Sequence, residues 1–242
     1  RRYYTSKLPF CHLAATLTGD NKVVSSKQSL LALVQNFLLE LLYPSYCLSC
    51  HSQENFLCHA CYHRLEFAWS PPDLREQEKT LGQIYFDQLQ VLAGFRPPFS
   101  QLVKALKYRG GKNLAPFLAQ MLQQHLIIPQ IDYLTFIPLH PDKLRIRGYN
   151  QCQVVAVKLG ELSHLPVKNL LERRVYSQAQ ATIKDPQLRL QRMAAAFQVR
   201  PKYKNFITGK NILLLDDIFT TGATVNAAAK VLKEAGVRKI QV

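Results

Sequence analysis

The sequence has no run of apolar residues long enough to cross a membrane. The nearest candidate, residues 29–43 (SLLALVQNFLLELLY), is interrupted by Gln35, Asn36 and Glu40, whereas a spanning helix needs about 18 to 20 apolar residues in succession. This excludes membrane insertion and predicts an amphipathic helix that packs on a core or a partner, with contact to a membrane surface as the alternative. The first residues also lack the pattern of a secretory signal, so a cytoplasmic location is expected.

Acidic residues are few. Asp and Glu number 16 against 31 Lys and Arg, which gives a formal net charge of +15 and a pI near 9.7. This imbalance favours an anionic partner such as nucleic acid, a membrane surface or a phosphorylated small molecule, although a protein that is merely basic remains the alternative. Because the basic residues are dispersed from Arg1 to Lys239, a detachable basic tail is excluded.

The 242 residues contain neither internal repeats nor a low-complexity tract, and this length allows one main domain plus a smaller unit. Four regions are predicted: an extension with the amphipathic helix (1–40), a cysteine-rich module (41–68), a proline-bearing linker (69–84) and a region of alternating strands and helices (85–242). That alternation predicts an α/β fold, a parallel sheet with helices on both faces. The start at Arg1 and the apolar run at Val242 leave open whether either terminus is complete.

Four cysteines, Cys47, Cys50, Cys58 and Cys61, form two C-x-x-C pairs separated by seven residues. Each pair can direct two thiolates at one ion, and two pairs complete the tetrahedral ligand set of zinc. Two disulfides are the rival interpretation, which the expected cytoplasmic location disfavours. The neighbouring histidines could replace one of the thiolates; they are His51, His59 and His63. Four thiolates leave no open coordination position, so the zinc is predicted to be structural.

The segment 211–224, NILLLDDIFTTGAT, is the candidate ligand-binding site of the α/β region 85–242. Its apolar start lacks alternation, as in a strand buried on both faces, and Asp216 and Asp217 follow at the carboxyl end. Open α/β sheets bind ligands at this edge, and the helix start near Gly222 offers free N–H groups and a positive dipole end to a phosphate. Carboxylates cannot hold that anion, so they must face hydroxyl groups or a cation of the same ligand. A sugar phosphate fits both halves.

The G-x-x-x-x-G-K-[ST] loop of nucleotide-binding proteins is absent. Instead, ILLLDDIFTTGAT resembles the 5-phosphoribosyl 1-pyrophosphate (PRPP) motif of the type I phosphoribosyltransferases. Residues 137–151 (IPLHPDKLRIRGYNQ), 104–115 (KALKYRGGKNLA) and 41–50 (LLYPSYCLSC) resemble segments of the ComF family, the ComFC and GntX-like proteins. The resemblance runs from about residue 41 to 242. One departure is Arg192, which stands where the family usually has Asn.

The resemblance implies the type I phosphoribosyltransferase fold and assigns roles to the motif residues. Asp216 and Asp217 would hold the ribose 2′- and 3′-hydroxyls. The 5′-phosphate would lie on residues Thr220, Thr221, Gly222, Ala223 and Thr224. Mg²⁺ would be bound with PRPP, mainly by ligand oxygens and waters. Pyrophosphate would lie on the backbone of Leu139 and His140 and on the cations Arg145, Arg147, Lys107 and Arg109, although surface cations are commonly just solvated.

Three function classes follow from the resemblance. The first is a Mg²⁺-dependent phosphoribosyltransferase with a nitrogen acceptor, in which Asp216, Asp217 and Arg147 are the catalytic candidates. The second is an accessory protein of natural transformation that binds single-stranded DNA and acts beside a DNA helicase. The third is a sensor that binds PRPP without turnover. Near Arg147, Gly148 is predicted to form a turn, Tyr149 to pack, and Asn150 to cap a helix that starts at Gln151.

Overall fold

The structure is a computed structural model that describes residues 46–53, 56–68, 74–108, 111–128, 130–173 and 196–242. The chain divides into two compact units, Arg1–Ser45 and Tyr46–Val242, and all described residues belong to the second. The predicted extension, its amphipathic helix, Arg109 and the segment that contains Arg192 lie outside the described residues.

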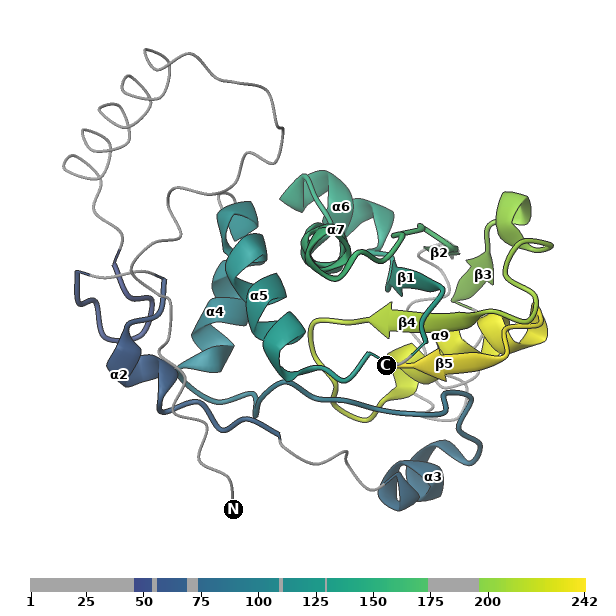
Figure 1. Cartoon of the computed structure of the whole chain (residues 1–242), viewed down its shortest axis with the longest axis horizontal. Coiled ribbons are helices and arrows are strands. Elements are labelled where there is room, and N and C mark those ends of the chain that lie inside the picture. Colours follow the sequence, from purple (N-terminus) through teal and green to yellow (C-terminus); the bar gives the residue numbers. More distant parts are fainter. Residues whose placement is uncertain (1–45, 54–55, 69–73, 109–110, 129, 174–195) are drawn as a thin grey trace, which may run out of the picture. The chain divides into compact units, whose positions relative to one another are not determined.

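A three-stranded parallel sheet holds the centre of the second unit (Figure 1). Its order is β1 (Tyr133–Phe136), β4 (Asn211–Leu215) and β5 (Lys239–Gln241). Residues 88–93 form two isolated bridges, Gln88 with Gln241 and Ala93 with Phe67, but no regular strand.

Successive residues of β4 face opposite sides of the sheet, as in any strand. Leu213 and Leu215 pack in one apolar cluster with helices α4 (Phe99–Ala105), α5 (Ala115–His125) and α7 (Gln151–Ser163). Ile212 and Leu214 pack in a second cluster with α9 (Ala223–Glu234). Because both faces are covered, every position from 211 to 214 is buried, which explains the apolar run without alternation. The predicted parallel sheet with helices on both faces is confirmed.

The other described elements connect or flank this core. They are the antiparallel pair β2 (Leu171–Arg173) and β3 (Phe197–Val199), helices α2 (His59–Tyr62), α3 (Arg75–Leu81) and α6 (Pro141–Arg147), and the 3₁₀ turns η1 (Gly111–Leu114) and η3 (Pro201–Tyr203). Helix α3 lies within the predicted linker, and the chain after it is tied to α9. The buried side chain of Asn226 accepts from the N–H of Tyr85 and donates to the carbonyl of Gln83, both at 2.8 Å.

The cysteine-rich residues share the apolar cluster of α4 and α5. Leu57, Cys58 and Leu65 are buried in the same cluster as Leu102 and Leu118. The ring of Phe67 also stacks on His125 of α5, with 4.1 Å between ring centroids. Residues 46–68 are therefore packed directly on two helices that cover the sheet.

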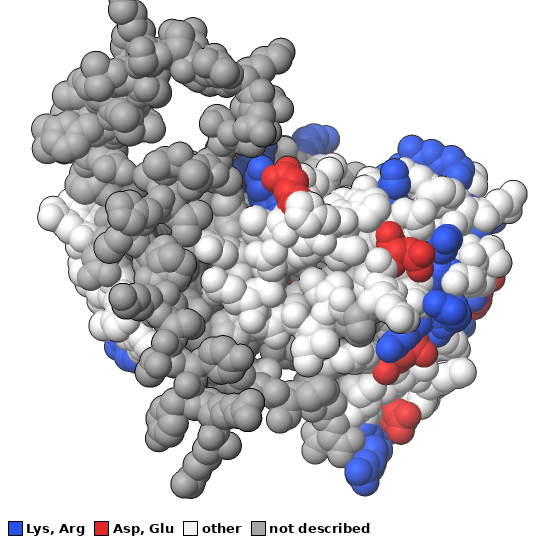
Figure 2. All heavy atoms as spheres, viewed as in Figure 1, with Lys and Arg blue, Asp and Glu red and all other residues white. Residues whose placement is uncertain are grey.

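Charged side chains on the face shown in Figure 2 lie mainly at one side, where Lys and Arg alternate with Asp and Glu. Ion pairs such as Lys210 with Asp132 and Lys233 with Asp87 bring opposite charges together. Where described side chains are visible on this face, positive and negative charges are interspersed. Of the helices in the described ranges, none is both long and apolar enough to cross a bilayer.

Candidate functional site

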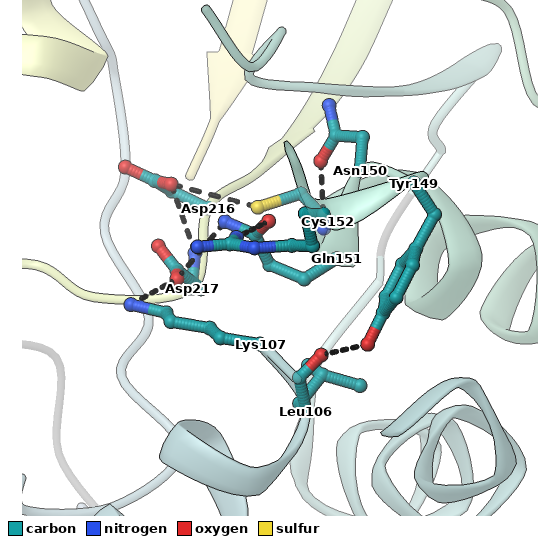
Figure 3. A network of polar contacts seen from close by, with 9 residues as sticks. Leu106, Lys107, Tyr149, Asn150, Gln151, Cys152, Asp216 and Asp217 are labelled. Carbon is teal, nitrogen blue, oxygen red and sulfur yellow. Dashed lines mark hydrogen bonds and ion pairs between the residues drawn. The ribbon is translucent and has the colours of Figure 1, made fainter. Parts of the chain in front are cut away.

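Asp216 and Asp217 directly follow β4, at the carboxyl edge of the sheet (Figure 3). Asp216 Oδ1 accepts from the N–H of Asp217 at 2.9 Å and lies 3.7 Å from Sγ of the buried Cys152. Burial raises the pKa of Asp216 to about 7, and the charge of Asp217 adds to this rise. Burial also raises the pKa of Cys152, so that its thiol keeps the proton that it donates toward Asp216.

Asp217 is bound by donors from two other elements. Its Oδ2 lies 2.7 Å from Nζ of Lys107 and accepts from Nε2 of Gln151 at 3.1 Å. Arg147 in turn donates to Oε1 of Gln151. Lys107 and Arg147 were predicted to bind pyrophosphate, and the structure brings both to the acid pair, Lys107 by direct contact and Arg147 through Gln151. Arg145, in contrast, pairs with Asp142 at 3.7 Å on the exposed surface.

The loop between Asp217 and α9 is shaped by Gly222 and Phe219. Gly222 has a φ of 80°, and a Cβ there would lie 2.7 Å from the Phe219 ring, so glycine is required for both conformation and space. Phe219 packs edge-to-face on Phe86, with 6.4 Å between centroids. With Phe219 anchored inward, Thr220 and Thr221 are exposed.

The start of α9 has backbone groups available for an anion. Thr221 Oγ1 accepts from the N–H of Ala223 at a long 3.4 Å. Within the described ranges, no acceptor is found for the N–H groups of Thr224 and Val225. An α-helix leaves its first N–H groups unpaired, and the dipole of this twelve-residue helix adds partial positive charge. The predicted phosphate loop therefore offers unpaired N–H donors and partial positive charge, both of which would favour an anion.

The loop after β1 leads into α6, which the sequence did not predict. His140 caps this helix, with Nδ1 accepting from the N–H of Asp142 at 3.3 Å, and Gly148 ends it with a φ of 79°. No residue of α6 is buried, so apolar periodicity could not have found it. The available signals were Pro141 at the first helical position and the glycine after the last. The predicted turn at Gly148 is confirmed.

Asn150 caps α7 as predicted. Its Oδ1 accepts from the N–H groups of Cys152 at 2.9 Å and Gln153 at 3.4 Å, while its Nδ2 donates to the carbonyl of Ile137 at 2.9 Å. One side chain thus fixes the start of α7 relative to the end of β1.

We expect Asn150→Ala to lower the free energy of unfolding by about 1–3 kcal/mol, because a helix cap is lost and a buried carbonyl loses its donor. Denaturant unfolding measures this difference. Asn150→Ser is the matched variant, since its hydroxyl keeps a neutral cap acceptor and loses the amide donor to Ile137, and it should fall between alanine and wild type. An alanine variant as stable as wild type would contradict the role of Asn150.

The raised pKa of Asp216 predicts a pH-dependent stability. An unfolded aspartate ionises near 3.8, whereas the folded Asp216 stays protonated up to about pH 7, so its ionisation costs stability that grows between these values and then levels off. An asparagine side chain at this position cannot ionise. The Asp216→Asn variant should therefore match wild type near pH 4 and be more stable above pH 7, by on the order of 2–4 kcal/mol. Thermal unfolding from pH 4 to 9 measures the difference; a gain independent of pH would contradict the burial of this carboxyl group.

Tyr149 packs, as expected, and also holds the chain next to Lys107. Its hydroxyl lies 2.5 Å from the carbonyl oxygen of Leu106 (Figure 3). It also lies 2.6 Å from the carbonyl oxygen of Tyr108. Neither this contact nor that of Gln151 with Asp217 was predicted. Tyr149 and Gln151 both lie within residues 147–151 (RGYNQ), and the resemblance of this stretch to the ComF family was the available sign that they matter to the site.

The four cysteine sulfurs converge on one point. Their Sγ atoms all lie within 4.8 Å of one another, and those of Cys50 and Cys58 are 3.5 Å apart. Zn–S bonds of about 2.3 Å in a tetrahedron place the sulfurs roughly 3.8 Å apart, so the donor set fits zinc. His59 and His63 face each other, with 2.8 Å between their Nε2 atoms, at an exposed position outside this cluster.

A cavity of about 310 Å³ borders the acid pair between residues 89–95 and the end of β4. Leu215 at the end of β4 and Val242 after β5 both line this cavity. Its walls are mainly apolar, including Val103, Leu118 and Val155. Apolar walls do not suit an anionic sugar phosphate, and we assign no ligand to this cavity.

Comparison with known proteins finds relatives in competence and DNA use. The chain is 28% identical over 169 residues to Competence protein F of Haemophilus influenzae, covering 65% of this chain and 71% of that protein. It is 33% identical over 136 residues to Competence protein ComFC of Streptococcus pneumoniae, covering 56% and 57%. It is 24% identical over 164 residues to DNA utilization protein YhgH of Escherichia coli, covering 65% and 70%. The match thus spans little more than half the length of ComFC.

Among solved structures, the chain is similar to glutamine PRPP amidotransferase from B. subtilis, with a TM-score of 0.42 and 18% identity. That alignment covers 57% of this chain and 29% of the amidotransferase. No protein-family model matches the chain. The sequence relatives nevertheless confirm the predicted resemblance: the chain is similar to the competence proteins F and ComFC and to DNA utilization protein YhgH.

Proposed function

We propose that this protein binds PRPP with Mg²⁺ at the carboxyl edge of its sheet and serves the uptake or processing of DNA. The observation that supports the proposal most strongly is the position of Asp216 and Asp217. They lie just before the start of α9, where backbone N–H groups have no acceptor within the described ranges. One half of this site accepts hydrogen bonds from hydroxyl groups and the other donates them to a phosphate. A ribose phosphate offers both groups on one molecule.

The cations around the acid pair suit the remaining part of PRPP. Lys107 contacts Asp217 directly, and Arg147 contacts it through Gln151. A diphosphate on the anomeric carbon of a ribose bound at Asp217 would therefore lie near both cations. Mg²⁺ would be held mainly by diphosphate oxygens and waters, since this small ion keeps much of its hydration. Leu139 and His140, at the end of the neighbouring strand, would add backbone contacts.

The reaction that this arrangement supports is displacement at the anomeric carbon. The bond from that carbon to the diphosphate oxygen would break, with its electron pair passing to that oxygen. A nitrogen nucleophile would form the new bond and release its proton to water, and inorganic pyrophosphate would leave. Positive charge develops on the ribose and negative charge on the leaving group. Asp216 and Asp217 would stabilise the first, and Arg147 and Lys107 the second.

A non-catalytic role in handling single-stranded DNA is the second candidate. The names of the relatives, competence and DNA utilization proteins, and the net charge of +15 favour it. In this version, PRPP acts as a bound signal, and the protein works beside a helicase on DNA that has entered the cytoplasm. Salt-dependent binding of single-stranded DNA by the full chain would support it, because released counterions make such binding weaken with salt.

We further propose zinc in the thiol cluster, with Cys47, Cys50, Cys58 and Cys61 as ligands. The donor set fits, and four thiolates close the coordination sphere, so the ion would stabilise the fold without taking part in a reaction. A cytoplasmic site is consistent with the need for reduced thiols.

Pyrophosphate release separates the two candidates. The full chain is incubated with PRPP, Mg²⁺ and candidate nitrogen bases, and release is followed with a coupled pyrophosphatase assay. Release that depends on a base would establish the transferase. Saturable PRPP binding without release would favour the accessory role, and failure to bind PRPP would contradict both forms of the proposal.

A further inference from the structure

The segment between β3 and β4, residues 200–210 (RPKYKNFITGK), carries an uncompensated positive charge. It contains no Asp or Glu and four cations, which are Arg200, Lys202, Lys204 and Lys210. Arg200 and Lys210 each lie near a carboxylate from elsewhere in the fold, at 3.7 and 3.4 Å. Within the described ranges, neither Lys202 nor Lys204 has a carboxylate partner. Both of these lysines are exposed, so they can meet an anionic partner.

The same segment presents an aromatic ring to solvent. Phe206 is 45% exposed, although the next residue, Ile207, is fully buried. The ring of Phe206 lies beside two others, with centroid distances of 4.9 Å to Tyr133 and 6.4 Å to Tyr203. Nζ of Lys202 lies 4.9 Å from the centroid of the Tyr203 ring. A ring with a solvent-exposed part is therefore held between fixed neighbours, with a lysine close by.

This surface lies at the opposite end of β4 from the acid pair. Residues 200–210 lead into Asn211, the first residue of β4, and Tyr133 is the first residue of the parallel strand β1 (Figure 1). Asp216 and Asp217 follow the last residue of β4. Five residues at about 3.3 Å each separate the two ends by roughly 16 Å. A ligand on residues 200–210 and Tyr133, the amino-edge surface, would thus leave the proposed PRPP site open.

We propose that the amino-edge surface binds single-stranded DNA; this inference rests on the accessory role given under the proposed function and assigns that role a site. Lysine side chains attract the phosphates of the strand, and a base can stack on the exposed part of Phe206. A single strand is favoured over a duplex because its bases offer uncovered faces to an aromatic ring, whereas the bases of a duplex already stack on each other.

The test measures binding of a fluorescent oligothymidylate to the full chain by anisotropy over a range of salt concentrations. Phe206→Ala should weaken binding by about 10- to 100-fold, because a base loses its stacking partner. The slope of log affinity against log salt should not change in this variant, since no charge is lost. Lys204→Gln should instead reduce that slope by about 0.7, because one phosphate contact no longer releases a counterion.

Two matched variants control for the general loss of an aromatic ring or a charge. Phe95→Ala removes a ring that is 47% exposed, and Lys104→Gln removes an exposed lysine of α4. Neither residue belongs to the amino-edge surface, so each variant should bind the oligonucleotide within about twofold of wild type. Thermal unfolding shows whether all four variants are folded.

The outcomes separate this inference from the proposed function. Folded Phe206→Ala with wild-type affinity, or equal affinity for the duplex of the same length, would overturn the inference and leave the accessory role standing. Wild-type protein that binds anionic lipid vesicles but not the oligonucleotide would also overturn the inference, in favour of a membrane partner, and would remove the accessory role on DNA. PRPP binding, measured separately, would stand in each of these cases.

Discussion

Replacing Cys58 with serine is expected to abolish binding of the proposed zinc and to loosen the described part of residues 46–68. A serine hydroxyl is a poor substitute for a thiolate, and structural zinc sites contribute on the order of 10–16 kcal/mol to folding in isolated peptides. Cys58 is buried in the same cluster as Leu102 of α4 and Leu118 of α5, so the loss should extend to these helices. The parallel sheet should remain folded, because its second cluster, around α9, contains no cysteine among the described residues.

Two measurements on the full chain check this expectation. Metal analysis should find about one zinc in wild type and none in Cys58→Ser, and hydrogen exchange should show lost protection in residues 46–68 but retained protection in β4. His63→Ala is the matched control, because His63 lies close in sequence but outside the thiol cluster, and it should keep its zinc. Full zinc retention in Cys58→Ser would remove this residue from the ligand set.

Asp217→Asn is expected to weaken PRPP binding by about 10- to 100-fold without unfolding the protein. Asparagine has the same shape but lacks the negative charge, and hydrogen bonds to charged groups contribute about 1.5–3 kcal/mol. The side chain also loses its ion pair with Lys107, which at this partly exposed position is a small cost to stability. Calorimetry with PRPP and Mg²⁺ gives the affinity, and thermal unfolding gives the stability.

Asp142→Asn removes the same charge elsewhere and serves as the control. Asp142 pairs with Arg145 on exposed α6 and makes no contact with the acid pair in the described structure. The affinity of the Asp142→Asn variant for PRPP should stay within about twofold of wild type, since an exposed charge away from the acid pair contributes little to binding. Equal affinities in Asp217→Asn and wild type would show that Asp217 does not hold the ribose.

The centre of the fold was predictable because its physical signals are local. The apolar run in β4 requires burial on both faces, and Gly222 requires a positive φ and close packing. The cap at Asn150 also follows from residue type at a helix start. The position of the two aspartates at the carboxyl end of β4 follows from their place directly after the apolar run. They were predicted to bind a ligand because open α/β sheets bind ligands at this edge.

The rest depends on contacts between distant segments. Helix α6 buries no residue and leaves no periodic pattern, and β2 is only three residues long. Lys107 was expected on the pyrophosphate because it lies in residues 104–115, which resemble a segment of the ComF family. Its pairing with Asp217 depends on a tyrosine 42 residues away, since Tyr149 fixes the chain on both sides of it. A single sequence does not specify which cation reaches which carboxylate.

A crystal structure of the full chain with PRPP and Mg²⁺ tests the central proposal most directly. We predict density for the 5′-phosphate on the N–H groups at residues 220–224, ribose hydroxyls on Asp216 and Asp217, and the diphosphate near Arg147 and Lys107. PRPP bound elsewhere, or crystals grown in saturating PRPP whose acid pair still contacts only Lys107, Gln151 and Cys152, would contradict it.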